Sequence, residues 1–260
     1  MLRRYGFDDI KLVSLPMETS IRLTSAQSPS TTQEIAYMHN IPYHESVGSL
    51  KYASVGTRPD VTYAVQTVSR FSKNLGQVHW EAVRRIFCYL KGSKELWLTY
   101  GGQQMDLKGY ADADRSMAED RHAISGYTFL FHGGAVSWAA KRQEIVSLST
   151  TESEYVAVTH ASKEALWLRS PISQLFDVVL EPTPLFSDNQ SAIALTKDHQ
   201  YHPQTKHIDI RFHFIRWVIK GESLRLIYCP TEAMLADSLT KALPSPKVKH
   251  FATELGLALV

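Results

Sequence analysis

The stretch KGYADADRS, residues 108–116, places two acids at the end of a short run that is typical of a β-strand. Asp112 and Asp114 are two positions apart, so on a strand both carboxylates point to the same side of the sheet. Like charges at that spacing repel each other, and aspartate has a low strand propensity. One interpretation is that the pair ends the strand in a solvated turn; the other is that at least one of the two acids binds a metal ion.

Length and composition bound the class of protein before any motif is considered. A chain of 260 residues with 44% hydrophobic residues is typical of a globular protein with one large or two small domains. The formal net charge is +2, so nucleic-acid binding would depend on local patches. The two cysteines are far apart, which favours a reducing, intracellular compartment, cytoplasmic or nuclear. We expect neither a signal peptide nor membrane association, because no apolar run could span a bilayer.

The hydrophobic pattern changes near residue 100 and predicts two kinds of structure. Before this point, residues 44–74 and 79–93 have helical spacing, and Pro59 could open a second helix at its first turn. After it, the pattern predicts strands over 96–102, 107–114, 125–141 (a hairpin), 184–188 and 224–230, and helices over 149–169, 189–197, 205–221 and 231–243. This order predicts an α/β fold in which helices pack on a mixed sheet.

Glu154 is the most informative acid because it lies on an apolar helix face. The residues that share this face are Val158, Ala161, Ala165 and Leu168. A carboxylate buried against a sheet is costly unless something pairs it. Glu152 lies on a more polar face and needs no special explanation, and Thr151 with Glu154 fits a capping box.

Two more acids lie where chain elements begin or end. Asp188 ends the apolar strand PLFS, and ligand sites in α/β sheets favour the carboxyl ends of strands. The alternative is that Asp188 caps the helix that follows it. Asp237 lies one turn into the predicted helix 231–243, where the alternative is a favourable charge near a helix N-terminus. If these acids converge with Asp112 and Glu154, their oxygen-only ligand set suits Mg²⁺ or Mn²⁺ rather than zinc.

Several runs in this order along the chain closely resemble the ribonuclease H domain of copia-type LTR retrotransposon Pol polyproteins. They are GYADAD (109–114), GYTFLFHGGAVSWAAKRQEIVSLSTTESEYVAV (126–158), FSDNQSAIALTK (186–197), TKHIDIRFHFIR (205–216) and YCPTEAMLADSLTKALP (228–244). The upstream runs 42–74 and 79–92 resemble the segment that joins the reverse-transcriptase thumb to that domain. The resemblance therefore covers nearly the whole chain.

The resemblance implies a ribonuclease H-like α/β domain over residues 101–245, with a mixed five-stranded sheet and flanking helices. It implies a mostly helical thumb and connection remnant over 1–100 and a C-terminal helix or tail over 246–260. The implied activity is hydrolysis of the RNA strand of RNA–DNA hybrids with two Mg²⁺ ions, for which Mn²⁺ could substitute. The implied partners are the hybrid and the rest of the reverse transcriptase or Pol polyprotein. The implied catalytic metal ligands are Asp112 (with Asp114 as second choice), Glu154, Asp188 and Asp237.

This sequence also departs from the family pattern. Arg115 replaces the usual aromatic residue after GYADAD, and Pro171 interrupts the long helix, where Ser170 could cap a new one. The segment before Asp237 is too short for the histidine-bearing loop of cellular ribonucleases H. The stretch YGFDDIK (5–11) only superficially resembles the Y-x-D-D pair of reverse transcriptases, and the palm and fingers are missing, so we expect no polymerase activity from this chain alone.

Other candidate residues have simpler interpretations. His199, His202, His207 and His213 have no accompanying cysteine and fit no common zinc spacing. Residues that could contact nucleic acid are Lys141 and Arg142, Lys206 with His207, and the stripe Arg84, Arg85 and Lys91. Trp138 and Trp167 are expected in the core. The alternatives to an active nuclease are a catalytically inactive nucleic-acid-binding remnant of a truncated retrotransposon and, with less support, an integrase-type strand transferase.

Overall fold

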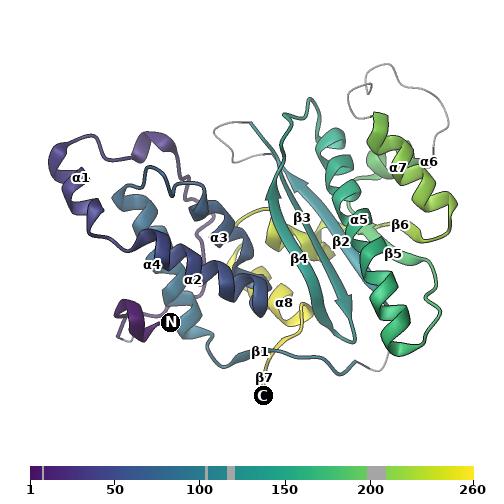
Figure 1. The fold of residues 1–260 in the computed structure, drawn as a ribbon, viewed down its shortest axis with the longest axis horizontal. Helices are drawn as coiled ribbons and strands as arrows, with labels where there is room; N and C mark the ends of the chain where they lie inside the picture. Colours follow the sequence, from purple (N-terminus) through teal and green to yellow (C-terminus); the bar gives the residue numbers. More distant parts are fainter. Residues whose placement is uncertain (8, 103–104, 116–120, 198–208) are drawn as a thin grey trace. The chain divides into compact units, whose positions relative to one another are not determined.

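The computed structural model describes the chain except residues 8, 103–104, 116–120 and 198–208 (Figure 1). The chain forms two compact units. The first comprises Met1–Thr99 with Lys241–Val260, and the second comprises Tyr100–Thr240. Within the described residues, no helix is both long and apolar enough to cross a membrane. The boundaries at residues 100 and 245 that the resemblance implies stay a prediction. In the structure, the last twenty residues belong to the first compact unit.

The second unit is built on one mixed five-stranded sheet. Its strands are β2 (Lys108–Asp114), β3 (Ile124–Phe131), β4 (Gly134–Arg142), β5 (Thr183–Ser187) and β6 (Leu224–Tyr228). Their order across the sheet is β4-β3-β2-β5-β6. The pairs β2–β3 and β3–β4 are antiparallel, whereas β2–β5 and β5–β6 are parallel. The sheet predicted from the sequence is therefore confirmed, with the architecture that the resemblance implies.

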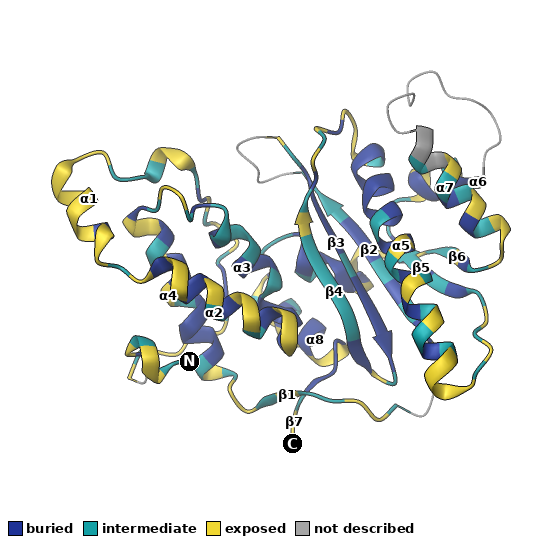
Figure 2. Ribbon diagram, in the orientation of Figure 1, coloured by how far each residue is buried: buried dark blue, intermediate teal, exposed yellow. Residues whose placement is uncertain are grey.

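Helix α5 (Thr150–Phe176) supplies the main apolar layer against this sheet, and Figure 1 shows it lying along β2 and β5. Its buried residues Tyr155, Val158 and Ala161 join Ala111 of β2 and Phe129 of β3 in one core. In Figure 2 the first half of α5 is mostly dark blue and its last turn is exposed. Helices α6 (Gln190–Lys197) and α7 (Asp209–Lys220) complete the unit and contact α5.

Two details of α5 differ from the sequence expectation. Ser149, not Thr151, caps the helix by accepting a hydrogen bond from the Glu152 N–H at 3.1 Å. The Glu152 carboxylate in turn accepts from the Leu148 N–H at 2.7 Å, which explains why this acid is buried instead of solvated. Pro171 lies inside one continuous helix, so Ser170 does not cap a second one. The helix continues because the loss of one backbone hydrogen bond is outweighed by packing on both sides of Pro171.

The predicted helix over 231–243 is wrong. The chain instead forms two short 3₁₀ helices, η5 (Thr231–Ala233) and η6 (Leu235–Leu239), and η6 packs on β2 and β3. The approach to β3 is very close: a Cβ added at Gly126 would lie 2.7 Å from Thr240 Cγ2 and 2.9 Å from Leu239 Cβ. Only glycine leaves room for this contact. We name residues 231–240 the closing segment.

The first unit is mostly helical. Its elements are η1 (Arg3–Tyr5), η2 (Ser25–Gln27), α1 (Thr32–His39), α2 (Tyr43–Gly56), η3 (Pro59–Val61), α3 (Thr62–Ser69), α4 (Gln77–Gly92), β1 (Leu96–Leu98), α8 (Ser245–Glu254) and β7 (Leu257–Leu259). Pro59 opens η3 immediately before α3, close to its predicted role. The strand predicted over 96–102 is only β1, which pairs antiparallel with β7 and not with the five-stranded sheet.

A buried ion pair organises the middle of the first unit. Arg58 donates to Asp60 from Nε at 2.9 Å and from Nη2 at 2.7 Å, and to the Ser93 carbonyl from Nη1 at 3.2 Å. The Tyr89 hydroxyl donates to the same Asp60 at 2.7 Å. Although burial lowers it, the hydrogen bond and charge of Asp60 raise the pKa of the Arg58 guanidinium above its ordinary value.

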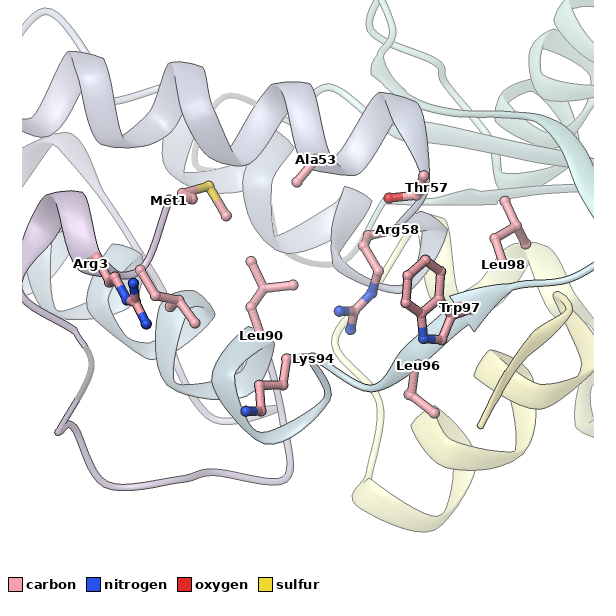
Figure 3. A pocket seen from close by; sticks show the side chains of 11 residues that line it. Met1, Arg3, Ala53, Thr57, Arg58, Leu90, Lys94, Leu96, Trp97 and Leu98 are labelled. Atoms are coloured by element: carbon pink, nitrogen blue, oxygen red, sulfur yellow. The ribbon is translucent and has the colours of Figure 1, made fainter. Parts of the chain in front are cut away.

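This guanidinium also borders a hollow of about 680 Å³ (Figure 3). The hollow is lined mainly by apolar side chains, among them Leu90, Leu96, Trp97 and Leu98. Most N–H donors of Arg58 are already bonded to Asp60 and Ser93, so its role at the edge of the hollow is structural.

Candidate metal centre

Three of the four predicted acids meet at one place in the second unit. Asp112 lies near the end of β2, Asp188 follows β5 directly, and Asp237 lies in η6. Each offers a carboxylate oxygen, and these oxygens all lie within 4.8 Å of one another. Asp112 and Asp237 are buried and Asp188 is half-buried. Residues separated by up to 125 positions in the sequence therefore form one compact acidic group.

The parallel pairing of β2 and β5 brings the first two acids together. Tyr110 of β2 is in register with Phe186 of β5. Continuing this register by two residues brings Asp112 level with Asp188 at the carboxyl ends of the strands. Asn189, not Asp188, caps α6, because its Oδ1 accepts a hydrogen bond from the Ala192 N–H at 2.8 Å. The alternative that Asp188 serves as the helix cap is therefore wrong.

The closing segment packs against β3 and supplies the third acid. Gly126, where this segment approaches most closely, is the β3 partner of Asp112. The same contact that requires a glycine therefore brings η6, and with it Asp237, onto Asp112. The Asp237 side chain is fully buried at 0% exposure. Asp237 lies in a 3₁₀ helix packed on the sheet, so its expected position in the first turn of an α-helix is not observed.

Hydrogen bonds from the closing segment reach the other two acids. The Thr240 hydroxyl donates to Asp112 Oδ2, and the Thr231 hydroxyl donates to Asp188 Oδ2 at 2.9 Å. Burial raises the pKa of the nearby Cys229 thiol, and the negative charges of Asp188 and Asp237 raise it further. The electrostatic environment is therefore negative, as a site for a cation requires.

Glu154 and Asp114 are placed differently. Glu154 is buried on α5, at 6% exposure, as its position on an apolar face predicts. Among the acids that the structure describes, the group with oxygens within 4.8 Å contains neither Glu154 nor Asp114. Asp114 is half-buried at the end of β2. A ligand role for Glu154 stays a prediction.

Sequence reasoning missed a buried glutamine that ties the start of α5 to the sheet. Gln143 is 1% exposed, and its Nε2 donates to Ser125 Oγ of β3 and to the Ser153 carbonyl, both at 2.8 Å. Its Oε1 accepts from the Ser147 hydroxyl at 2.9 Å. Because Ser153 precedes Glu154, this amide fixes the helix turn that carries Glu154. Its only sequence signal is a polar residue directly after a strand, which is too common to be informative.

The other candidates have ordinary surroundings where they are described. Arg85 forms an ion pair with Glu18 at 2.6 Å, and Lys91 donates to the Ile10 carbonyl at 3.0 Å, so these two cations make contacts within the first unit. Lys141 lies on the surface 3.5 Å from Glu144. Trp138 is half-buried, but Trp167 is 64% exposed, so its predicted core position is wrong.

Several candidates lie elsewhere in the chain. His199, His202, Lys206 and His207 fall outside the described residues, and His213 is exposed on α7. The described residues of the stretch 5–11 form no strand. Arg115 is half-buried directly after β2, and Arg142 ends β4. Arg84 belongs to α4.

The donor chemistry of the acidic group fits a divalent metal. Three carboxylate oxygens within 4.8 Å of one another form a hard, anionic donor set, which Mg²⁺ and Mn²⁺ prefer. The fold and this site together define an α/β protein with a largely buried group of three aspartates whose oxygens are close enough to hold a metal ion.

Comparison with known proteins then shows the family. The chain is 43% identical over 248 residues to the retrovirus-related Pol polyprotein from transposon TNT 1-94 of Nicotiana tabacum, covering 95% of this chain and 19% of that protein. It is 32% identical over 265 residues to the corresponding polyprotein from transposon RE2 of Arabidopsis thaliana, covering 100% of this chain and 18% of that protein. The chain belongs to the retrovirus-related Pol polyproteins of transposons, and it spans about a fifth of the length of these curated relatives. The resemblance identified from the motifs is confirmed.

The other comparisons add less. No protein-family model matches the chain. A solved structure of LC11-RNase H1 in complex with RNA/DNA hybrid is similar at a TM-score of 0.40 and 15% identity, covering 52% of this chain and 94% of that one.

Proposed function

We propose that this chain is a metal-dependent endonuclease that hydrolyses the RNA strand of RNA–DNA hybrids as part of a retrotransposon Pol polyprotein. The observation that carries the proposal is the convergence of Asp112, Asp188 and Asp237. Membership of the Pol polyprotein family supports the substrate class, because the motifs that surround these acids resemble those of the ribonuclease H domain of such polyproteins.

The proposed roles follow from the positions of the acids. Asp112, Asp188 and Asp237 would hold two Mg²⁺ ions, with Mn²⁺ able to substitute, and Glu154 is the proposed fourth ligand. When bound, such ions supply the charge that activates a water molecule and stabilises the leaving 3′ oxygen of a phosphodiester. The rigid strand ends keep Asp112 and Asp188 in place, and the packing on Gly126 keeps Asp237 beside them. Recognition of the hybrid would rest on its backbone, with 2′-hydroxyls marking the RNA strand.

The test is cleavage of a labelled RNA–DNA hybrid in Mg²⁺ and then in Mn²⁺ by the full chain and by Asp188→Asn. We expect cleavage of the RNA strand alone, reduced by roughly 10³-fold or more in the variant, because several kcal/mol of charge stabilisation depend on the ligand set. Single-stranded RNA and duplex DNA of the same sequence are the substrate controls. No cleavage by the folded chain in either metal would contradict the proposal.

That negative outcome would favour the alternative function, a catalytically inactive nucleic-acid-binding remnant of a truncated retrotransposon. The departure at Arg115 supports this alternative, whereas Pro171 gives it little support because α5 continues through it. Binding of the uncleaved hybrid would then be retained. We also propose that the chain alone has no polymerase activity, which primer extension on a DNA-primed RNA template would test.

A further inference from the structure

The closing segment contributes more to the acidic centre than Asp237. We propose that Thr240 is a positioning residue whose hydroxyl orients Asp112 for metal binding, and that Thr231 does the same, more weakly, for Asp188. The inference rests on the proposed metal-binding function of these acids. It concerns two hydroxyls that lie on the same ten-residue segment, one at each end.

Thr240 is held rigidly enough to orient a carboxylate. Its side chain is fully buried, and its hydroxyl donates to Asp112 Oδ2. The same hydroxyl lies 3.3 Å from the Asp237 carbonyl, and its backbone N–H donates to that carbonyl at 3.2 Å. The methyl group packs so close to Gly126 that a Cβ added there would lie 2.7 Å from it. A β-branched side chain packed on one side has few rotamers available, so the position of the hydroxyl oxygen is defined.

Thr231 makes the equivalent contact at the other end of the segment. Its hydroxyl donates to Asp188 Oδ2 at 2.9 Å. The backbone beside it is tied to β5, because the Cys229 N–H donates to the Ser187 carbonyl at 3.0 Å. Thr231 itself is exposed, so water can replace its hydroxyl more easily than that of Thr240. We therefore expect the smaller effect at this position.

The chemical consequence follows from the donors that each carboxylate accepts. A carboxylate has two oxygens with about four acceptor sites, so a hydroxyl bound to Oδ2 fixes the rotation of the group and still leaves acceptor sites for a metal ion. Hydrogen bonds that orient metal ligands in this way typically matter by about 10–100-fold in metal affinity or activity. One short segment thus supplies one acid and orients two others.

The experiment compares Thr240→Val with Thr240→Ser in the full chain. Valine keeps the shape and removes the hydroxyl, whereas serine keeps the hydroxyl and removes the methyl group. Mn²⁺ binding is measured by isothermal titration calorimetry, and kcat and KM are measured on the hybrid. We expect roughly 10-fold or greater loss of Mn²⁺ affinity in Thr240→Val, a lower kcat at saturating hybrid with little change in KM, and recovery of both in Thr240→Ser. Thr231→Val should lose less than about 10-fold.

A matched control separates this effect from the general cost of replacing a buried threonine with valine. Thr159 is equally buried, and its hydroxyl donates to the Tyr155 carbonyl within α5 at 2.8 Å. Thr159→Val should leave Mn²⁺ affinity unchanged. Circular dichroism of each variant checks that it is folded.

The outcomes distinguish this inference from the proposed function. If the wild type binds Mn²⁺ and cleaves the hybrid but Thr240→Val matches it in affinity and kcat, the orienting role is overturned and the nuclease stands. If the wild type binds Mn²⁺ without cleaving, and Thr240→Val binds more weakly, the orienting role is supported and the nuclease is overturned. If the folded wild type binds no Mn²⁺, both are overturned.

Discussion

Buried carboxylates occur at two places in this chain, and their surroundings differ. Asp60, in the first unit, accepts hydrogen bonds from the Arg58 guanidinium on both of its oxygens and from the Tyr89 hydroxyl. Asp112, Asp188 and Asp237, in the second unit, instead bring carboxylate oxygens within 4.8 Å of one another. Of these, Asp112 and Asp188 accept hydrogen bonds from threonine hydroxyls. In the first arrangement a guanidinium faces the carboxylate, whereas in the second the described carboxylate oxygens face one another at a spacing that could hold a metal ion.

The difference shows that burial alone does not identify a functional acid. Asp60 is 7% exposed and Asp112 is 3% exposed, yet Asp60 faces a guanidinium and Asp112 faces two other acids. An acid whose two oxygens are engaged by a neighbouring guanidinium is a structural element. Acids that face other acids raise the free energy of the metal-free protein, and that cost is recovered when a divalent ion binds. Three substitutions test this contrast.

The largest effect is expected from Asp60→Asn. The change leaves the buried Arg58 charge without its anion, and breaking a buried pair in this way costs about 3–5 kcal/mol. For a chain of this size we expect the melting temperature to fall by roughly 6 °C or more, measured by calorimetry. The control is Glu95→Gln, which breaks an exposed pair with Lys94 and should cost little. Equal shifts in the two variants would show that the buried pair is not structural.

A middle-sized effect is expected from Gly126→Ala. The new Cβ would stand 2.7 Å from Thr240 Cγ2 and 3.0 Å from the Ala236 carbonyl, so the closing segment must move off β3. Overpacking of this kind costs about 1–3 kcal/mol, and it should also weaken Mn²⁺ binding because Asp237 moves with the segment.

Gly48→Ala is the matched control, because nothing lies within 4 Å of the added Cβ on the exposed face of α2. It should stabilise the protein slightly, by up to about 1 kcal/mol. Unchanged Mn²⁺ affinity in Gly126→Ala would mean that the close approach to β3 does not build the site.

The smallest effect, and the one of opposite sign, is expected from Asp237→Asn. This is the same chemical change as Asp60→Asn, but it removes one of three facing negative charges. In the presence of a chelator we expect the melting temperature to rise by about 2–4 °C, equivalent to roughly 1 kcal/mol. Saturating Mn²⁺ should stabilise the wild type more than the variant. A lower melting temperature without metal would show that Asp237 is stabilised by the protein as Asp60 is.

The acids themselves could be found from the sequence, for reasons specific to each. Asp112 stands out because a strand seldom contains two aspartates, and Glu154 because it interrupts an apolar helix face. These are conflicts between a local pattern and a polar residue, which a sequence displays directly. Asp60 is not recognisable in this way, because Tyr89 of α4, 29 positions further along the chain, reaches it only in the folded structure.

Local geometry was harder to predict where packing overrides propensity. The helical pattern of residues 231–243 becomes two 3₁₀ helices, because the segment lies against Gly126 instead of on a continuous apolar face. Ser149 caps α5 and Thr151 does not, although both residues have the hydroxyl side chain that helix N-caps prefer. Pro171 stays inside α5, where the buried residues Leu168 and Ile172 keep both sides of the helix on the core.

By itself, the sequence determined the α/β class, the mixed sheet, the family and four candidate acids, because periodicity and motifs are properties of neighbouring positions. The folded structure was needed to show that three of these acids share one site and that Thr240 reaches Asp112. The physical reason is that these contacts join positions as far apart as 112 and 240. Strand register and the glycine-sized gap at Gly126 bring such positions together, and both exist only in the folded chain.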